Sequence, residues 1–263
     1  MSCPHDRSGL HKAGDKPNPV GASSPAAPTV GSLVISGTDS VLTGSATAYT
    51  ATATLSDGST RTVMPSWSSS AVHVATVDNA GRLDGLVHGS TTLTAVYDGR
   101  SASRTVQVVN DYGGRWSGRY VIRVCRDSGI FRDGIYAGSY VDVPWCQALD
   151  GIGSEHSFAF TLVQSGRNYS EIRATFGPDG GTISGVVTAD GRLELEGSLK
   201  ILDWYGDHWG DLQFSGWDTN RDRAGGMTGR WAQNLTMVGQ QGSAYDEAEL
   251  VTMSRTAAAS ASR

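Results

Sequence analysis

The chain has 263 residues, of which 34 are glycine and only 18% are charged, and its formal net charge is −5. This length is enough for two domains of ordinary size, and the composition favours short strands and tight turns over long helices. The acidic balance and the lack of a lysine/arginine run argue against a nucleic-acid partner, and no apolar run of 18 residues is present that could span a bilayer as a helix.

Residues 1–28 are predicted to form a disordered tether, because their Pro/Ser/Ala-rich composition offers few apolar side chains to offset the cost of ordering. Cys3, ahead of this stretch, resembles the lipid-bearing cysteine at the mature N-terminus of a lipoprotein; an incidental exposed cysteine is the alternative. Residues 1–20 contain no apolar segment of the signal-peptide kind. We therefore expect any export to use a signal peptide that this sequence does not include.

Residues 29–110 are predicted to form an antiparallel sandwich, because short alternating strands are separated at regular intervals by turn signals. The expected strands carry these residues: Leu33 and Ile35; Tyr49, Ala51, Ala53 and Leu55; Val72, Val74 and Thr76; Leu93, Ala95 and Tyr97. The turn signals include Asp57-Gly58, Gly81 and Asp98-Gly99, where glycine supports the backbone conformation that a tight turn needs.

The same segment resembles a bacterial Ig-like domain of group 2. The resemblance rests on Leu55-Ser56-Asp57-Gly58-Ser59, Trp67-Ser68-Ser69-Ser70, Val74-Ala75-Thr76-Val77-Asp78, Gly81, Gly89 and Thr92-Leu93-Thr94-Ala95. It implies a spacer or adhesive module on a cell surface, without catalytic residues. Trp67 is expected to fill the space between the two sheets.

Residues 111–255 are predicted to form a second all-β domain, and residues 256–263 a disordered tail. An opening strand after Gly113 is followed by seven candidates that are joined by short turns. Their positions are Phe158–Val163, Ile172–Phe176, Ile183–Val187, Leu193–Leu199, Gly210–Trp217, Met227–Leu235 and Tyr245–Met253. Eight sequential antiparallel strands favour an up-and-down barrel, with an open meander or a second sandwich as alternatives.

A lipocalin- or avidin-like resemblance enters at Gly114-Arg115-Trp116, which looks like the Gly-x-Trp that opens lipocalin barrels. The resemblance implies that Trp116 closes one end of the barrel beneath an arginine that follows the last strand. Arg255 occupies that sequence position and is expected to make a cation–π contact with Trp116.

Cys125 and Cys146 bracket part of an insertion at residues 126–156 that has little regular pattern. We expect them to form a disulfide, which would contribute about 3 kcal/mol by the chain-entropy argument and would indicate an oxidising compartment. Two buried free thiols are the alternative.

The densest polar-aromatic stretch runs from Asp203 to Asp211 and suggests a ligand contact, because aromatic rings stack on sugars while carboxylates accept hydroxyl hydrogens. The candidate ligand-binding residues are Trp204, Tyr205, Asp207, His208 and Trp209. A loop whose aromatics simply cover the barrel mouth is the alternative. The stretch lacks the second histidine or cysteine of a zinc site. The Asp218-x-Asn220-x-Asp222 spacing lacks the glycine and the glutamate of a calcium loop, because Arg223 and Gly229 occupy those positions.

Together these features predict an exported, non-enzymatic bacterial protein of the outer surface or periplasm, without metal or cofactor. The Ig-like unit would be a stalk, and the barrel would bind a small apolar ligand or a glycan. A purely structural or adhesive module that contacts another cell-surface protein is the second hypothesis, and a carbohydrate-active enzyme the third.

Overall fold

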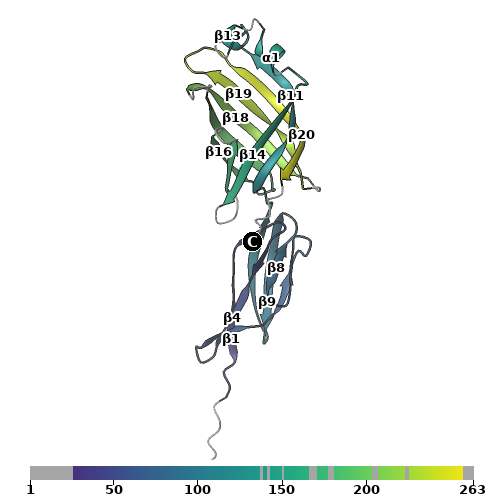
Figure 1. Ribbon diagram of the computed structural model, residues 1–263. Coiled ribbons are helices and arrows are strands. Elements are labelled where there is room, and N and C mark those ends of the chain that lie inside the picture. The colour runs from purple at the N-terminus through teal and green to yellow at the C-terminus, as the bar shows by residue number, and fades with distance from the viewer. Residues whose placement is uncertain are drawn as a thin grey trace, which may run out of the picture.

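The computed structural model describes residues 26–136, 139–140, 143–149, 151–165, 171–176, 181–202, 207–222 and 225–256. Two β-rich units lie end to end, with the N-terminal unit below and the C-terminal unit above in Figure 1. The prediction of an all-β protein is confirmed.

The N-terminal unit is built from three small sheets that enclose one core. One sheet has the order β1-β4-β5, with strands Val30–Ser36, Thr50–Leu55 and Thr60–Val63. The next has the order β2-β10-β9-β6, with strands Ser40–Leu42, Arg100–Val109, Gly89–Tyr97 and Ser66–Ser69. The last has the order β3-β8-β7, with strands Ala46–Ala48, Arg82–Gly85 and Ala75–Val77.

Alternation along these strands buries one face of each, as the sequence pattern predicts. Tyr49 is the largest fully buried side chain of this unit, and its hydroxyl donates a hydrogen bond to the Thr38 carbonyl oxygen at 2.7 Å. Trp67 is half-buried and packs against the same core, so it lies at the edge of the core that we expected it to fill. A side chain at Gly81 would come within 3.2 Å of the Trp67 ring.

The strand predicted through Val72, Val74 and Thr76 is wrong in its first half. Strand β7 begins only at Ala75, because residues 71–74 form a turn in which the amides of Val74 and Ala75 both donate to the Ala71 carbonyl oxygen. Val72 is consequently 65% exposed, whereas Val74 packs into the core.

The C-terminal unit is a closed antiparallel barrel of eight strands in sequence order, which confirms the barrel and rules out the open alternatives. Its strands are β11 (Gly114–Asp127), β14 (Glu155–Ser165), β15 (Glu171–Phe176), β16 (Thr182–Val187), β17 (Leu193–Leu202), β18 (His208–Arg221), β19 (Met227–Met237) and β20 (Ala244–Thr256). Strand β11 closes the barrel because it pairs with both β14 and β20. Closure pairs every barrel strand with a neighbour on each side, which removes the fully open edge that an open sheet would present as a template for aggregation.

The insertion after β11 lies at the end of the barrel distant from the N-terminal unit (Figure 1). Its described residues include the short 3₁₀ helix η1 (Gly129–Phe131), the pair β12 (Ile135–Tyr136) and β13 (Ser139–Tyr140), and the helix α1 (Trp145–Ala148). Phe131 is fully buried there against Leu235 and Ala244. Neither helix in the described residues has the length and apolar character needed to cross a membrane.

Candidate functional site

The structure places only part of the predicted ligand-binding stretch. Trp204 and Tyr205 lie outside the described residues. Asp207 and His208 are exposed, and His208 Nε2 lies 3.0 Å from Asp211 Oδ1. Trp209 is half-buried and packs on the cluster around Phe131, so it helps to cover the distal end of the barrel. This role corresponds to the alternative interpretation of the stretch, in which its aromatics cover the barrel.

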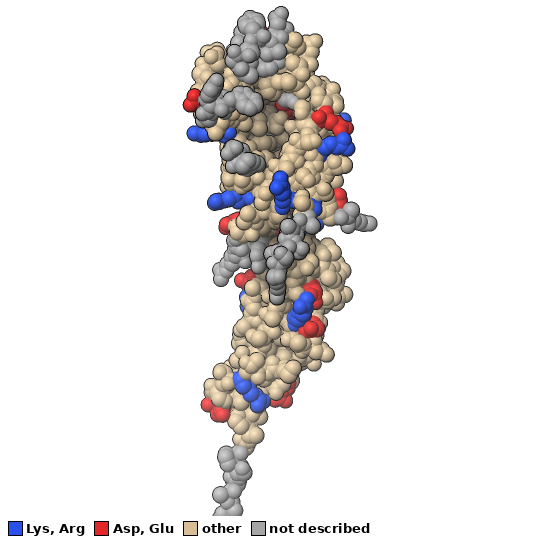
Figure 2. Space-filling view, viewed as in Figure 1, with Lys and Arg blue, Asp and Glu red and all other residues tan. Residues whose placement is uncertain are grey.

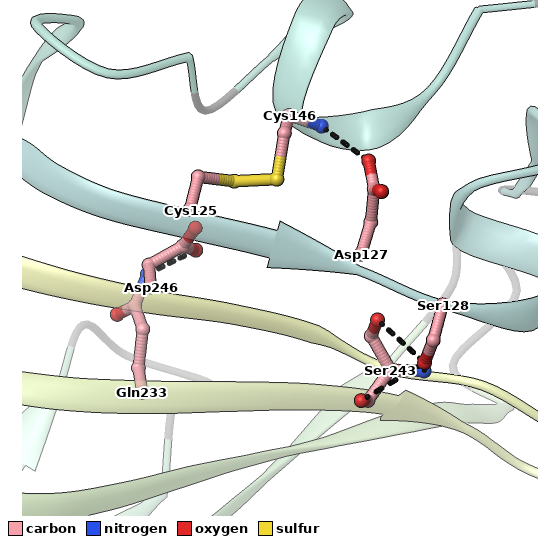
Figure 3. Close-up of a disulfide and its surroundings, with 7 residues drawn as sticks. All are labelled: Cys125, Asp127, Ser128, Cys146, Gln233, Ser243 and Asp246. Carbon is pink, nitrogen blue, oxygen red and sulfur yellow. Dashed lines mark hydrogen bonds between the residues drawn. A yellow bond between two sulfur atoms is a disulfide. The ribbon is translucent and has the colours of Figure 1, made fainter.

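Cys125 and Cys146 form the expected disulfide, which ties the start of α1 to strand β11 (Figure 3). The Cys146 amide also donates a hydrogen bond to Asp127 Oδ2 at 3.0 Å. On the adjacent strands Gln233 Nε2 donates to Asp246 Oδ2 at 3.4 Å, and Asp246 is only 2% exposed. The disulfide and the Cys146–Asp127 hydrogen bond therefore hold the insertion to the barrel end, while the buried Gln233–Asp246 pair joins β19 to β20 beside them.

Among the described residues, two groups of potential metal ligands have donor atoms that are already engaged in other bonds. The two sulfur atoms near Asp246 belong to the disulfide and are not thiolate ligands. In the aspartate-rich segment, Asp218 pairs with Arg192, and Asp222 Oδ1 accepts the Gly226 amide at 2.8 Å. Asp222 therefore shapes the β18–β19 turn.

An aromatic cluster fills much of the barrel interior. The Trp217 and Trp231 rings stack with centroids 4.6 Å apart, and Phe160 meets Trp217 edge-on at 5.6 Å. Ile122, Phe160, Leu193 and Leu195 are at most 1% exposed, whereas Tyr120 and Phe158 are only partly buried. The interior is therefore packed towards the N-terminal unit and less enclosed around Tyr120.

The barrel wall is lower on one side. Phe176, the last residue of β15, pairs with Phe160, so residues 155–159 of β14 extend beyond β15. Pairing of β16 with β17 likewise ends at Glu196, although β17 continues to Leu202. Figure 2 shows the barrel hollowed on this face. The half-buried side chains of Tyr120, His156 and Phe158 line up at this level, with the Tyr120 and His156 rings stacked at 5.3 Å.

The opposite barrel end is closed by Trp116, but the arginine over its ring is Arg221 and not Arg255. The Arg221 guanidinium carbon lies 5.3 Å from the ring centroid, and Trp116 is fully buried. Arg255 is directly opposite Trp116 in the strand register, yet its side chain lies over Gly114 and binds Asp111 Oδ2 at 2.8 Å. The predicted cation–π contact between Arg255 and Trp116 is therefore wrong, because the carboxylate of Asp111 holds Arg255 away from the indole.

This closed end is also where the two units meet. Asn110 Nδ2 donates to the Gly191 carbonyl oxygen at 2.9 Å, and His88 Nε2 lies 2.9 Å from the Ala189 carbonyl oxygen. Tyr112 is fully buried and its hydroxyl donates to the same Gly191 oxygen at 2.7 Å. Leu42 and Val109 of the N-terminal unit pack against the hydrophobic core of the barrel.

The connecting segment, residues 110–113, is fixed from both sides. Gln164 on β14 accepts the Tyr112 amide at 2.8 Å and donates to the Asn110 carbonyl oxygen at 2.9 Å. The Asp111 amide donates to Thr43 Oγ1 of the N-terminal unit at 3.0 Å, while the Asp111 carbonyl oxygen accepts from Arg221. We call this set of contacts the joint: His88, Asn110, Asp111 and Tyr112 on one side, and Gln164, Ala189, Gly191, Arg221 and Arg255 on the other.

Sequence reasoning missed the joint, because residues 110–114 have the polar, glycine-containing composition of an ordinary linker. The only local signal is Tyr112, a large aromatic in a segment without strand alternation. Its burial depends on the β16–β17 turn and on β14, both more than 50 residues away along the chain.

No curated protein matches the sequence. Among solved structures, the chain is similar to "Structure of surface layer protein SbsC, domains 4-9" at 12% identity and a TM-score of 0.30, covering 84% of this chain and 31% of that one. It is similar to "Structure of the S-layer protein SbsC, domains 5-6" at 14% identity and a TM-score of 0.27, covering 84% of this chain and 98% of that one.

The family comparison concerns the N-terminal unit alone. Residues 31–108 match the family model described as bacterial Ig-like domain (group 2), and these bounds fall within strands β1 to β10. The N-terminal unit of this chain is therefore a bacterial Ig-like domain of group 2.

Proposed function

We propose that the protein is a bacterial cell-surface module in which the Ig-like unit is a stalk that holds the barrel in a fixed orientation. The family of the N-terminal unit fits a structural or adhesive role at the cell surface. The contacts of the joint are the main support for this proposal. A flexible linker would be enough to tether a barrel, whereas here residues 110–112 form hydrogen bonds with both units and so fix the orientation of the barrel.

The proposal includes export through a signal peptide, with Cys3 as the position of a lipid anchor, and it assigns the chain no catalytic step. The disulfide between Cys125 and Cys146 supports an oxidising compartment. Protease treatment of intact source cells tests the location. We expect release of the barrel while a cytoplasmic marker stays intact; protection of both to the same extent would contradict a surface location.

A second candidate function is binding of a small apolar ligand at the open side of the barrel. The half-buried rings of Tyr120, His156 and Phe158 support it, because they present an aromatic surface at the level where β14 extends beyond β15. Aromatic side chains are typical of sites that bury apolar ligands.

Fluorescence titration with 1-anilinonaphthalene-8-sulfonate tests this second function. We expect saturable binding by the full chain and an affinity about tenfold lower in Phe158→Ala, a loss of about 1.4 kcal/mol. Val163→Ala is the matched control, since Val163 lies on the outer face of the same strand and is 55% exposed. Equal affinities in the two variants, or no saturable binding, would favour a purely structural barrel.

A further inference from the structure

The outer wall of the barrel carries a second concave site, independent of the joint and of the open side. A groove of about 670 Å³ runs over strands β18, β19 and β20. Its charged lining consists of Arg123, Arg192, Arg230, Asp218, Glu247 and Glu249. Side chains of small size form much of the remainder, among them Gly216, Thr228 and Ala232.

The charges form an ordered row across neighbouring strands. Arg230 on β19 is directly opposite Glu249 on β20 and Asp218 on β18 in the strand register. Glu249 is bound by Arg123 at 2.7 Å, and Asp218 is bound by Arg192. Each carboxylate beside Arg230 is therefore already engaged by another arginine. The exposed Arg230 side chain itself has no hydrogen bond or ion pair among the described residues.

The backbone opens space beside this arginine. The pairing of β18 with β19 is irregular between Ser215 and Asp218, and Gly216 lies in that bulge with φ +56°. A Cβ atom at Gly216 would meet no atom within 4 Å. A β-bulge with an unfilled outer face is a common way to shape a recognition surface on a sheet. The volume falls within the range of small-molecule sites.

The charges of the lining favour a ligand that carries a single negative charge and several hydroxyl groups. Three arginines and three carboxylates make the lining neutral overall, so a compact polyanion such as phosphate would be repelled by the three carboxylates. Asp218 and Glu249 are fixed by arginines, and Glu247 Oε1 accepts the Tyr245 hydroxyl at 3.1 Å. Fixed carboxylate oxygens can accept hydroxyl hydrogens, while the planar fork of Arg230 suits a single carboxylate.

We propose that this groove binds an acidic oligosaccharide, in which a sugar carboxylate pairs with Arg230 and neighbouring hydroxyl groups donate to Asp218, Glu247 and Glu249. The contact with Arg230 is the source of preference for an acidic over a neutral sugar. The flanking arginine–carboxylate pairs keep the acceptors in place before binding, which limits the ordering cost.

Isothermal titration of the full chain with a galacturonic acid trimer tests the proposal, with a neutral galactose trimer as the comparison ligand. We expect saturable binding of the acidic trimer and at least tenfold weaker binding of the neutral one. Arg230→Gln should weaken binding of the acidic trimer about tenfold and abolish the preference. Arg173→Gln is the matched control, because Arg173 is an exposed arginine on β15 that does not line the groove.

Ala232→Trp provides a second variant that fills the groove without removing a charge. It should abolish binding while the thermal unfolding midpoint stays near that of the wild type. The proposal is overturned by absence of saturable binding at millimolar trimer, by equal binding of both trimers, or by equal losses in Arg230→Gln and Arg173→Gln. Binding that survives in Ala232→Trp would also overturn it, because the ligand would then lie elsewhere.

Discussion

Replacing Tyr112 with phenylalanine removes one hydrogen-bond donor, the Tyr112 hydroxyl, from the joint. The Tyr112 hydroxyl donates to the Gly191 carbonyl oxygen at 2.7 Å, and the side chain is fully buried. The carbonyl oxygen keeps a second donor, Asn110 Nδ2, at 2.9 Å. Because the acceptor remains satisfied, we expect Tyr112→Phe to lower the free energy of unfolding of the barrel by about 1 kcal/mol at pH 8.

The same variant should behave differently at alkaline pH. Burial is the main cause that raises the pKa of Tyr112, to about 12. Its value in the unfolded chain is about 10. A folded pKa above the unfolded one means that stability is fully present below pH 10 and is lost as the pH rises towards 12. The wild type should therefore lose about 1.4 kcal/mol through this group by pH 11, and Tyr112→Phe should lose none of it.

Urea unfolding at pH 8 and pH 11, followed by fluorescence of the buried Trp116, Trp217 and Trp231, measures both effects. The wild type should be more stable than Tyr112→Phe by about 1 kcal/mol at pH 8, and the order should vanish or reverse slightly at pH 11. Taking the difference between the two proteins cancels the ionisation of all other tyrosines. An identical difference at both pH values would refute the buried, neutral hydroxyl in the joint.

Three further changes test the surrounding structure. Gly191→Ala should lower the thermal unfolding midpoint by several degrees more than its control Gly239→Ala. Both glycines have positive φ (84° and 71°), but a Cβ atom at Gly191 would lie 2.8 Å from the His88 ring, whereas a Cβ atom at Gly239 would meet no atom within 4 Å. Equal shifts of the midpoint would speak against contact between the units. Replacing both Cys125 and Cys146 with alanine should lower the free energy of unfolding of the barrel by about 3 kcal/mol in urea, and an unchanged midpoint would contradict a stabilising disulfide. Phe131→Ala should lower the free energy of unfolding by about 3–5 kcal/mol. This loss should add to that of Tyr112→Phe in the double variant, because the two residues lie in separate hydrophobic clusters. A loss in the double variant that differs strongly from the sum would show that the two barrel ends are not independent.

Strand positions were predictable where alternation and burial coincide. In β17, Leu193 and Leu195 are fully buried, while Glu194 and Glu196, which alternate with them, are exposed, so the period of two identifies both the strand and its inner face. The same reasoning failed at Val72, where an apolar side chain in a tight turn has no sheet to pack against.

Side-chain partners that depend on register were less predictable. Arg255 follows the last strand as the lipocalin-like resemblance requires, but the sequence does not reveal that Asp111 competes for its guanidinium. Arg221 reaches Trp116 from the end of β18, and burial followed by the nearby Arg255 lowers the pKa of Arg221. The joint and the row around Arg230 likewise arise from strands that only the closed barrel brings together.

Residual dipolar couplings of backbone amides in the full chain test the fixed joint most directly. Couplings from the Ig-like unit and from the barrel should fit one shared alignment tensor, and Gly191→Ala should make the two fitted tensors diverge. Separate tensors of different magnitude for the two units in the wild type would mean that they reorient independently, which would contradict the fixed presentation of the barrel.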